Sequence, residues 1–201
     1  MTRRCLFAFL LAFVGLSAHL TADAQAKSGG PKTKTSPLVT TIYLVRHAEK
    51  DTAVSPTDPP LSAEGQLRAQ ALRKLMARRK PTALFTTDTK RTRATLAPLG
   101  AATRVAPQVY DARQPEALAA RIRRDYAGQT LVVVGHSNTL LPLIKVLGVN
   151  PPVAEIADDE FDAVFTIRLS DGVPPTVELS RYGAARKPAK PGAKSVGNTM
   201  K

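Results

Sequence analysis

The chain has 201 residues, of which 22% are charged and only 5% aromatic, and its formal net charge is +13. Few aromatic residues, and no motif for reading a groove or stacking bases, argue against nucleic-acid binding despite the basic balance. The single cysteine, Cys5, lies in an apolar stretch near the N-terminus. The rest of the chain therefore has neither a disulfide framework nor a cysteine metal site.

The first 26 residues have the pattern of a signal peptide. Arg3 and Arg4 precede the apolar run Leu6–Ala18, which is too short to span a membrane with ease, and small residues allow cleavage after Ala24 or Ala26. We expect export to the periplasm or the medium, with no stable membrane anchor after cleavage. An uncleaved anchor is the alternative.

Much of the excess positive charge lies in two terminal segments. Lys27–Pro37 holds three lysines and no acid, and Ala184–Lys201 holds five basic residues and no acid. Both segments are rich in Pro, Gly, Ser and Lys, a composition typical of disorder. We expect a disordered basic linker over 27–37 and a disordered basic tail over 184–201. The tail has the charge to touch an anionic envelope surface, although a solvated tail without a partner is the simpler expectation.

The segment between these ends, residues 38–183, is long enough for one domain. Its apolar patterns predict strands over residues 38–46, 83–86, 104–110, 130–134, 161–169 and 176–182. Helices are predicted from Ser62 onward and over residues 91–99, 115–126 and 140–147. The first helix is expected to have one apolar face, made of Leu67, Ala71, Leu72, Leu75 and Met76. Alternating strands and helices indicate an α/β fold, a three-layer α/β/α sandwich with a mostly parallel central sheet.

Two histidines directly follow strand-like runs. His47 comes after Thr41–Arg46, and His136 comes after Leu131–Gly135. In an open α/β sheet, ligands bind at the carboxyl ends of parallel strands. Because Arg46 precedes His47, the two histidines predict one site that handles an anion. The alternative is that each histidine only caps its strand by hydrogen bonding.

Three other kinds of site share part of this pattern. His47-Ala48-Glu49 has the H-x-E spacing of a zinc deaminase, but the required cysteine pair is missing. Gly135–Thr139 imitates a G-x-S-x-G nucleophile elbow, but it lacks the last glycine and no histidine follows it. A metal centre on the two histidines would need carboxylates beyond Glu49, and none is indicated. We therefore expect no metal and no cofactor.

Arginine and histidine together suit the chemistry of a phosphoryl group. The arginine fork matches phosphate geometry, and a neutral imidazole can attack phosphorus through its bare nitrogen. Arg46 and His47 supply both parts at one strand end. Arg91 lies at the start of a helix just beyond another strand, where free backbone N–H groups also favour an anion. A solvated helix arginine is the alternative for Arg91.

Four segments carry a resemblance to a known family. They are Leu44–Glu49, Asp58–Gly65 with the following Gln70-Ala71, Phe85–Thr92 and Val132–Ser137. In type and in order they resemble the motifs of the histidine phosphatase superfamily, which has the phosphoglycerate mutase-like fold. The resemblance implies that His47 is a nucleophile that becomes phosphohistidine. It also implies that Arg46, Arg91 and His136 complete the phosphate pocket.

The chain departs from the family pattern where a general acid is expected. One branch has a glutamate after the third strand, where this chain reads Tyr110–Gln114, and the other has an aspartate where Ser137 stands. Asp111 and Glu49 are the remaining candidates for the acid. Ala48 also replaces a usual glycine, which is a small change. Lys50 and Asn138 are secondary candidates for binding substrate, with solvated or helix-capping roles as their alternatives.

These observations predict an exported phosphatase. It would hydrolyse small phosphomonoesters or phosphoramidates through a phosphohistidine and without a metal. The resemblance is to a short member without a cap insertion, which argues against a phosphoglycerate mutase. The alternative is a protein that binds phosphorylated envelope components in the same pocket without turnover. The physiological substrate stays open.

Overall fold

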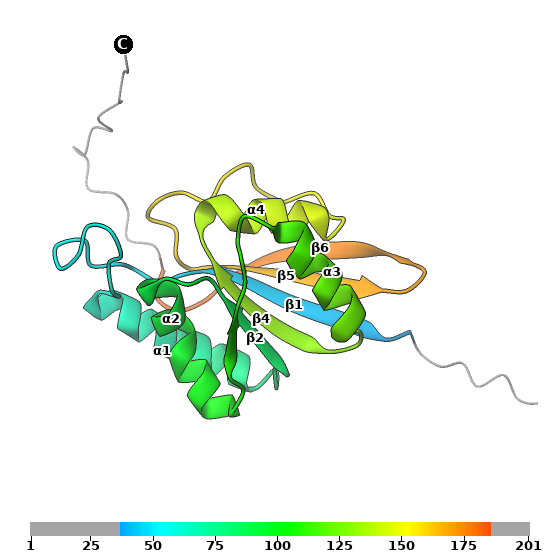
Figure 1. Ribbon diagram of the computed structural model, residues 1–201, viewed down its shortest axis with the longest axis horizontal. Helices are drawn as coiled ribbons and strands as arrows, with labels where there is room; N and C mark the ends of the chain where they lie inside the picture. Colours follow the sequence, from blue (N-terminus) through cyan, green and yellow to red (C-terminus); the bar gives the residue numbers. More distant parts are fainter. Residues whose placement is uncertain (1–36, 186–201) are drawn as a thin grey trace, which may run out of the picture. The chain divides into compact units, whose positions relative to one another are not determined.

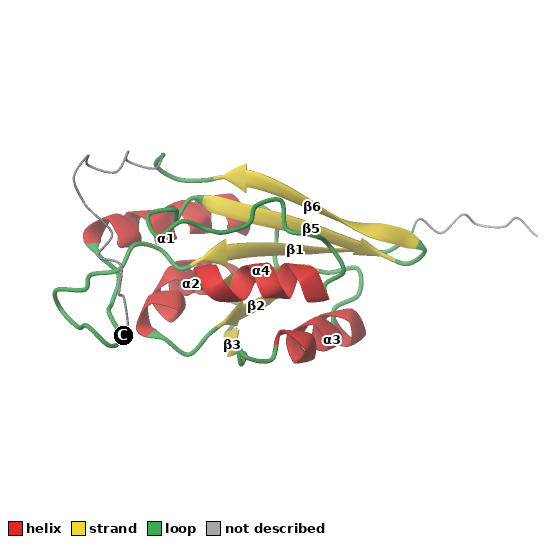
Figure 2. Ribbon diagram, turned by 90° about the horizontal axis from the view of Figure 1, so that it is seen from above, coloured by secondary structure: helices red, strands yellow, loops and turns green. Residues whose placement is uncertain are grey.

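The computed structural model describes residues 37–185 and forms a mixed six-stranded sheet with two helices on each face (Figure 1, Figure 2). The strands lie in the order β3-β2-β4-β1-β5-β6. The strands are β1 (Val39–Arg46), β2 (Ala83–Thr86), β3 (Pro107–Val109), β4 (Thr130–Gly135), β5 (Ala163–Ser170) and β6 (Val173–Arg181). The helices are α1 (Ala63–Ala77), α2 (Lys90–Thr103), α3 (Pro115–Asp125) and α4 (Ser137–Val146). The predicted α/β sandwich is confirmed.

Parallel pairing is confined to one half of the sheet. The pairs β1–β4, β2–β4 and β2–β3 are parallel, whereas β1–β5 and β5–β6 are antiparallel. The carboxyl ends of β1, β2, β3 and β4 therefore lie at one edge. The closing pair expected near the end of the chain is the hairpin of β5 and β6, which extends the sheet beyond β1.

The central strands are apolar on both faces because helices cover both. Along β1, Ile42 and Leu44 pack into the core beneath α3 and α4, whereas Tyr43 and Val45 pack into the core beneath α1 and α2. The alternation follows from the two-residue period of a strand. Burial on both sides leaves the strand ends as the place where polar side chains reach a solvent-facing site.

Helix α1 begins where the sequence predicts, but it turns a different face to the core. Ser62 caps it by accepting a hydrogen bond from the N–H of Gly65 at 3.2 Å. Leu72 and Met76 are buried as expected, whereas Leu67 is 72% exposed. Arg68 takes the buried position instead, because its guanidinium pairs with Glu49. The expected apolar face is therefore wrong at Leu67.

Most other predicted elements are confirmed, with shifted ends. The third strand is only three residues long, and α2 and α4 both begin before their expected starts. No helix among residues 37–185 is long and apolar enough to cross a membrane. The predicted signal peptide and nearly all of the predicted linker and tail lie outside the described residues. Of the tail, Ala184 and Ala185 are described, and the carbonyl of Ala184 accepts a hydrogen bond from Arg68.

Candidate active site

The two histidines meet at the carboxyl edge of the sheet. In the parallel pairing of β1 with β4, Arg46 is opposite Gly135, so His47 and His136 each follow a paired residue. The N–H of His47 donates to the carbonyl of Gly135 at 2.9 Å, which continues the ladder past the strand ends. The ring centroids lie 5.3 Å apart in an edge-to-face arrangement. The geometry brings together the two side chains that the sequence singled out.

The contacts of His47 fix its tautomer. Its Nδ1 lies 2.7 Å from the carbonyl oxygen of Ala48, which can only accept, so Nδ1 carries the proton. The side chain is buried, and this burial, with contributions from Arg46, His136 and Arg91, lowers the pKa of His47 to about 3. At neutral pH the ring is therefore uncharged and its Nε2 has a free lone pair. That is the state a nucleophilic imidazole needs.

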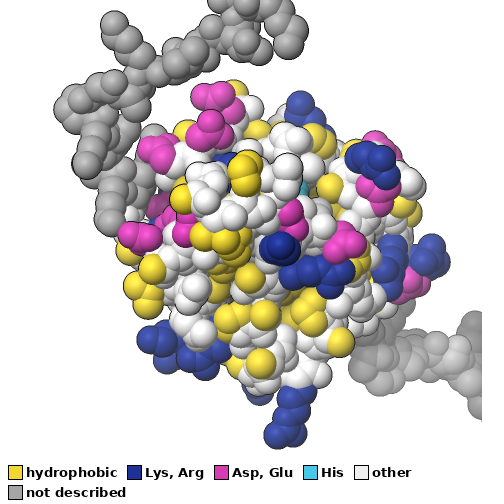
Figure 3. All heavy atoms as spheres, turned by 60° about the vertical axis from the view of Figure 1, so that its left-hand side comes forward, with side chains coloured by type: hydrophobic (Ala, Val, Ile, Leu, Met, Phe, Trp, Pro, Cys, Tyr) yellow, Lys and Arg dark blue, Asp and Glu magenta, His cyan; other side chains and the backbone are white. Residues whose placement is uncertain are grey.

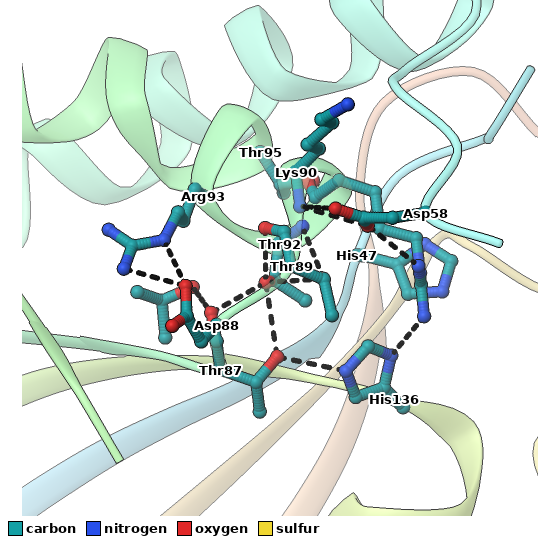
Figure 4. Close-up of polar contacts among 12 residues, drawn as sticks. His47, Asp58, Thr87, Asp88, Thr89, Lys90, Thr92, Arg93, Thr95 and His136 are labelled. Atoms are coloured by element: carbon teal, nitrogen blue, oxygen red, sulfur yellow. Dashed lines mark hydrogen bonds and ion pairs between the residues drawn. The ribbon is translucent and has the colours of Figure 1, made fainter. Parts of the chain in front are cut away.

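His136 is held through the opposite nitrogen. Its Nε2 lies 2.8 Å from Oγ1 of Thr87, which donates onward to Oγ1 of Thr92 at 3.0 Å (Figure 4). The Nδ1 of His136 accepts a longer contact from Arg91, at 3.5 Å. Burial first, then Arg91, Arg46 and Lys50, lower the pKa of His136 to about 4. The His136 ring is thus neutral in the free protein, with Nδ1 turned toward the arginine.

Arg46 is fixed by backbone carbonyls and an aromatic ring. Its Nη1 donates to the carbonyls of Ala157 at 2.7 Å and Glu160 at 3.3 Å, and its Cζ lies 4.5 Å from the Phe161 ring centroid. The Nε of Arg46 is buried and has no protein partner. A buried donor without a partner is costly, so an orphan here indicates a group that binds something else.

Arg91, on α2, also has a buried Nε without a protein partner. Its Nη1 pairs with Asp58 at 3.4 Å. Asp58 also accepts from the N–H of Lys90 at 3.1 Å, so the loop carboxylate occupies a backbone donor at the start of α2. Two arginines with orphan donors beside two neutral histidines make an electropositive cradle that matches a phosphate.

Buried contacts hold the segment after His47 against both helices on its face. The N–H of Ala48 donates to Oγ1 of Thr95 at 2.9 Å, and Thr95 donates to the carbonyl of Arg91 at 2.7 Å. On the other side, a Cβ placed on Gly65 would lie 2.2 Å from the carbonyl oxygen of Glu49. Only glycine permits this close approach of α1 to the segment after His47.

The two candidates for a general acid are engaged elsewhere. Both carboxylate oxygens of Glu49 accept from Nε of Arg68, at 2.8 and 2.9 Å, and Nη2 adds a third contact at 2.7 Å. Asp111, after β3, is bound by the side chain and N–H of Arg113, and these bonds lower the pKa of its carboxyl. The contacts that hold both carboxylates are with residues outside the histidine pair, so the role of proton donor stays a prediction for each.

The secondary candidates lie around the rim. Lys50 is exposed, forms an isolated bridge with Leu61, and is close enough to lower the pKa of His136. Asn138 is exposed on the first turn of α4. Within residues 37–185 no group of three or more His, Cys, Asp or Glu side chains has the arrangement to hold a metal ion.

Three residues of the site were missed in the sequence. Thr87 follows β2 directly, so its strand-end position was a usable signal. Asp58 belongs to a segment that carried the resemblance, but nothing in the sequence indicated that it reaches Arg91. Phe161 was expected inside a strand, whereas it precedes β5 and stacks on Arg46. The last two contacts depend on loops that cross the edge of the sheet.

Comparison with known proteins supports the resemblance that the sequence motifs indicated. The family model of the histidine phosphatase superfamily (branch 1) matches residues 42–114, a range that includes Arg46, His47 and Arg91. Over this range the chain is similar to the histidine phosphatase superfamily. His136 lies beyond the matched range, and the structure brings it to the other three. A search of curated proteins found no match.

Solved structures with the same fold include several proteins named as phosphatases. A mycobacterial glucosyl-3-phosphoglycerate phosphatase has a TM-score of 0.60 and 14% identity, over 71% of this chain and 99% of its own. A protein from Escherichia coli, provisionally named an alpha-ribazole-5'-P phosphatase, has a TM-score of 0.58 and 16% identity, over 71% and 96%. A protein from Agrobacterium tumefaciens, provisionally named phosphohistidine phosphatase SixA, has a TM-score of 0.52 and 17% identity, over 72% and 98%. At these identities the likeness shows the fold alone.

Proposed function

We propose that this protein is a histidine phosphatase, which hydrolyses small phosphomonoesters or phosphoramidates through a phosphohistidine on His47, without a metal. The observation that carries the proposal is the tautomer of His47. Its Nδ1–H is bound to the Ala48 carbonyl at 2.7 Å, which leaves Nε2 bare beside two arginines with unpartnered Nε donors. The match of residues 42–114 to the family model and the phosphatase names of the similar structures support the same activity.

The reaction proceeds in two displacements at phosphorus. In the first, the Nε2 lone pair of His47 forms the P–N bond while the bond from phosphorus to the leaving group breaks, and the leaving group takes its electron pair and then a proton. In the second, water attacks phosphorus, the P–N bond breaks, and its electrons return to Nε2. The proton of the water passes to solvent or to the released phosphate. His47 ends in its starting state.

Arg46, Arg91 and His136 stabilise the phosphoryl oxygens in both displacements. Donors held in place before the reaction need no reorganisation as charge builds up, which is why such contacts are strong in a buried site. A phosphate dianion next to His136 favours the imidazolium, so bound substrate would raise the low pKa of this ring. His136 would then donate from Nδ1 to the phosphate and from Nε2 to Thr87. The chain's own cations supply this charge, which is the basis for proposing a reaction without a metal.

The supply of a proton to the leaving group sets the expected substrate range. Glu49 is bound to Arg68, and Asp111 is bound to Arg113. Leaving groups that depart as stable anions need little help from an acid, whereas aliphatic alcohols need a proton. We therefore expect turnover to fall steeply as the pKa of the leaving group rises.

The test is hydrolysis of a series of substituted phenyl phosphates by chelator-treated protein. Wild type should turn over the activated members, and vanadate should inhibit by occupying the phosphate cradle. His47→Ala should be inactive. Loss of activity on chelation that zinc or magnesium restores would contradict the mechanism without a metal. If the protein binds these esters without hydrolysing them, it is a binding protein rather than a phosphatase.

Export is a further part of the proposal, and it rests on the sequence of residues 1–26 alone. Expression in a Gram-negative host, followed by fractionation, should place the mature protein outside the cytoplasm. Mass spectrometry of that protein would show cleavage after Ala24 or Ala26. An intact N-terminus in the membrane fraction would instead indicate an uncleaved anchor.

A further inference from the structure

A groove of about 520 Å³ lies beside the phosphate cradle, between α1, the loop before β5 and the end of the described chain. This volume is in the range of sites for small molecules. Five of its lining side chains are apolar, namely Leu67, Ala71, Phe161, Ala184 and Ala185. Figure 3 shows one face of the molecule, on which apolar side chains lie among charged ones and very little histidine surface is visible.

Phe161 joins the groove to the cradle. Its ring lies over Arg46, with 4.5 Å from Cζ to the ring centroid, and its centroid is 5.9 Å from that of His47. The same side chain lines the groove. A molecule that placed its phosphoryl group against His47 and Arg46 could therefore extend past Phe161 into the groove.

Helix α1 presents apolar side chains to this groove, and their exposure to water is unfavourable. Leu67 and Ala71 lie one helical turn apart and both line it, and Leu67 is 72% exposed. The helix takes this rotation because Arg68 points inward to Glu49 and to the carbonyl of Tyr182 at 3.1 Å. Leu67 is therefore not part of the hydrophobic core. Its exposed side chain lines the groove, where it can contact a ligand.

The polar part of the lining is already engaged. Its charged side chains are Glu49, Glu64, Arg68 and Asp159. Glu49 and Arg68 bind one another, and Arg68 also donates to the carbonyls of Tyr182 and Ala184. Glu64 accepts from the Ser62 hydroxyl at 3.3 Å, and Asp159 interacts electrostatically with Arg46. A sugar leaving group needs many hydrogen-bonding partners, and a site that leaves its hydroxyl groups unpaired rejects it. An aromatic ring or a branched alkyl group needs only apolar contact.

We propose that this groove binds the leaving group of the substrate, and that the preferred substrates carry an aromatic leaving group rather than a sugar. This assignment rests on the proposed function and names its substrate class. Phe161 borders both the polar cradle and the groove. Leu67 is a specificity-determining residue that contacts the leaving group and does not touch the phosphoryl group.

The test separates binding in the groove from catalysis. The probes are naphthylmethylphosphonate and methylphosphonate, which share the anionic group and cannot be hydrolysed as esters. In wild type the naphthyl compound should bind about tenfold more tightly or better by calorimetry. Leu67→Gln should remove most of that preference and leave methylphosphonate binding unchanged. Val173→Gln is the matched control, because Val173 is 53% exposed and does not line the groove.

A matched pair of substrates gives the second readout. Cyclohexylmethyl phosphate and glucose 6-phosphate have primary alkoxide leaving groups on six-membered rings and differ mainly in polarity. Wild type should show the higher kcat/KM for the cyclohexyl compound, and Leu67→Gln should narrow the ratio. Acetyl phosphate has a leaving group too small to fill the groove, so wild type and Leu67→Gln should hydrolyse it equally fast.

The outcomes distinguish this inference from the proposed function. Equal binding of the two phosphonates by wild type overturns the groove assignment, even if acetyl phosphate is hydrolysed. A preserved preference in Leu67→Gln also overturns it, because the contact would then lie elsewhere. A clear naphthyl preference without turnover of any ester supports the groove and overturns the catalytic proposal. Because Leu67 is largely exposed, Leu67→Gln should fold, and the comparison of the two phosphonates in wild type does not depend on it.

Discussion

The ends of β1 and β4 carry a histidine at matching positions of neighbouring strands, yet the two rings are held through different nitrogens. His47 is tied by Nδ1 to a backbone carbonyl, which leaves Nε2 bare. His136 is tied by Nε2 to the Thr87 hydroxyl and turns Nδ1 toward Arg91. The strand end therefore determines where each ring lies, and the nitrogen that is hydrogen-bonded determines what the ring can do. One ring is prepared to attack, and the other to hold charge.

The largest expected effect separates these two roles. His47→Asn should abolish turnover because no other bare nitrogen replaces Nε2. His136→Asn should lower kcat by about a hundredfold to a thousandfold, the usual loss for one preorganised donor, while a phosphoenzyme still forms. Single-turnover quenching with an aryl phosphate measures both steps. A phosphoenzyme in His47→Asn but none in His136→Asn would reverse the assignment.

The next largest loss of activity is expected for Arg91, because it is part of the phosphate cradle and also contacts His136. Arg91→Ala should cost about 3 kcal/mol of transition-state stabilisation, or roughly a hundredfold in kcat/KM. Arg93→Ala is the matched control on the same helix, since Arg93 pairs with exposed Asp88. The control should stay near wild type. Equal losses in the two variants would point to a general effect of charge rather than to the cradle.

Substitution of Thr87 tests whether the hydrogen bond between its hydroxyl and Nε2 of His136 contributes to activity. Thr87→Val keeps the shape but leaves the Nε2–H of His136 without its acceptor, so activity should fall by about tenfold. Thr87→Ser keeps the hydroxyl and should recover most of it. Nitrogen NMR of the ring gives a readout that a loss of packing would not produce. Wild type and Thr87→Ser should show the Nε2–H tautomer, and Thr87→Val a mixture; an unchanged tautomer in Thr87→Val would exclude this role.

The pH dependence of the free energy of unfolding distinguishes the two histidine rings. Folding lowers the pKa of His47 to about 3 and of His136 to about 4, both from 6.5, so the unfolded chain binds more protons below pH 6.5. The free energy of unfolding should therefore fall as the pH drops, by about 2 kcal/mol per ring between pH 7 and 5. The contribution of His136 should level off below pH 4, while that of His47 continues toward pH 3. Denaturant titrations of wild type, His47→Gln and His136→Gln isolate each ring, and identical pH slopes in all three would contradict the shifts.

The smallest effect is expected from removing the ends of the chain. A protein of residues 37–185 should keep its melting temperature within about 2 °C and its activity on a small ester, because the ends have the composition of disorder. The cut is placed after Ala185 because the Ala184 carbonyl accepts from Arg68. A large drop in melting temperature would show that a removed segment packs on the domain.

The sequence predicts the sheet better than the details of the site. The apolar runs of β1 and β4 are long and buried on both faces, so their periodicity identifies them, and His47 and His136 follow at once. Arg91 could be placed because it begins a helix directly after a strand. These cases share a local signal, in which the backbone determines where the side chain goes.

The remaining contacts depend on which long side chain reaches another element. Periodicity placed Leu67 in the core, but burial of the Glu49–Arg68 pair rotates α1 and exposes Leu67. Asp58 reaches Arg91 from a proline-rich loop, and Phe161 covers Arg46 from the loop before β5. Charge pairing across loops has no periodic signature in a single sequence. The groove beside the cradle follows from these contacts, so it could not be foreseen.

Covalent catalysis through Nε2 of His47 is tested by the chemical identity of the phosphoenzyme. Wild type mixed with an activated aryl phosphate and quenched in alkali should yield one phosphorylated residue that is stable in base and labile in acid. Peptide mapping should place it on His47, and phosphorus NMR should assign the phosphoryl group to Nε2. Phosphate on His136, on Nδ1 of His47 or on a serine would contradict the account.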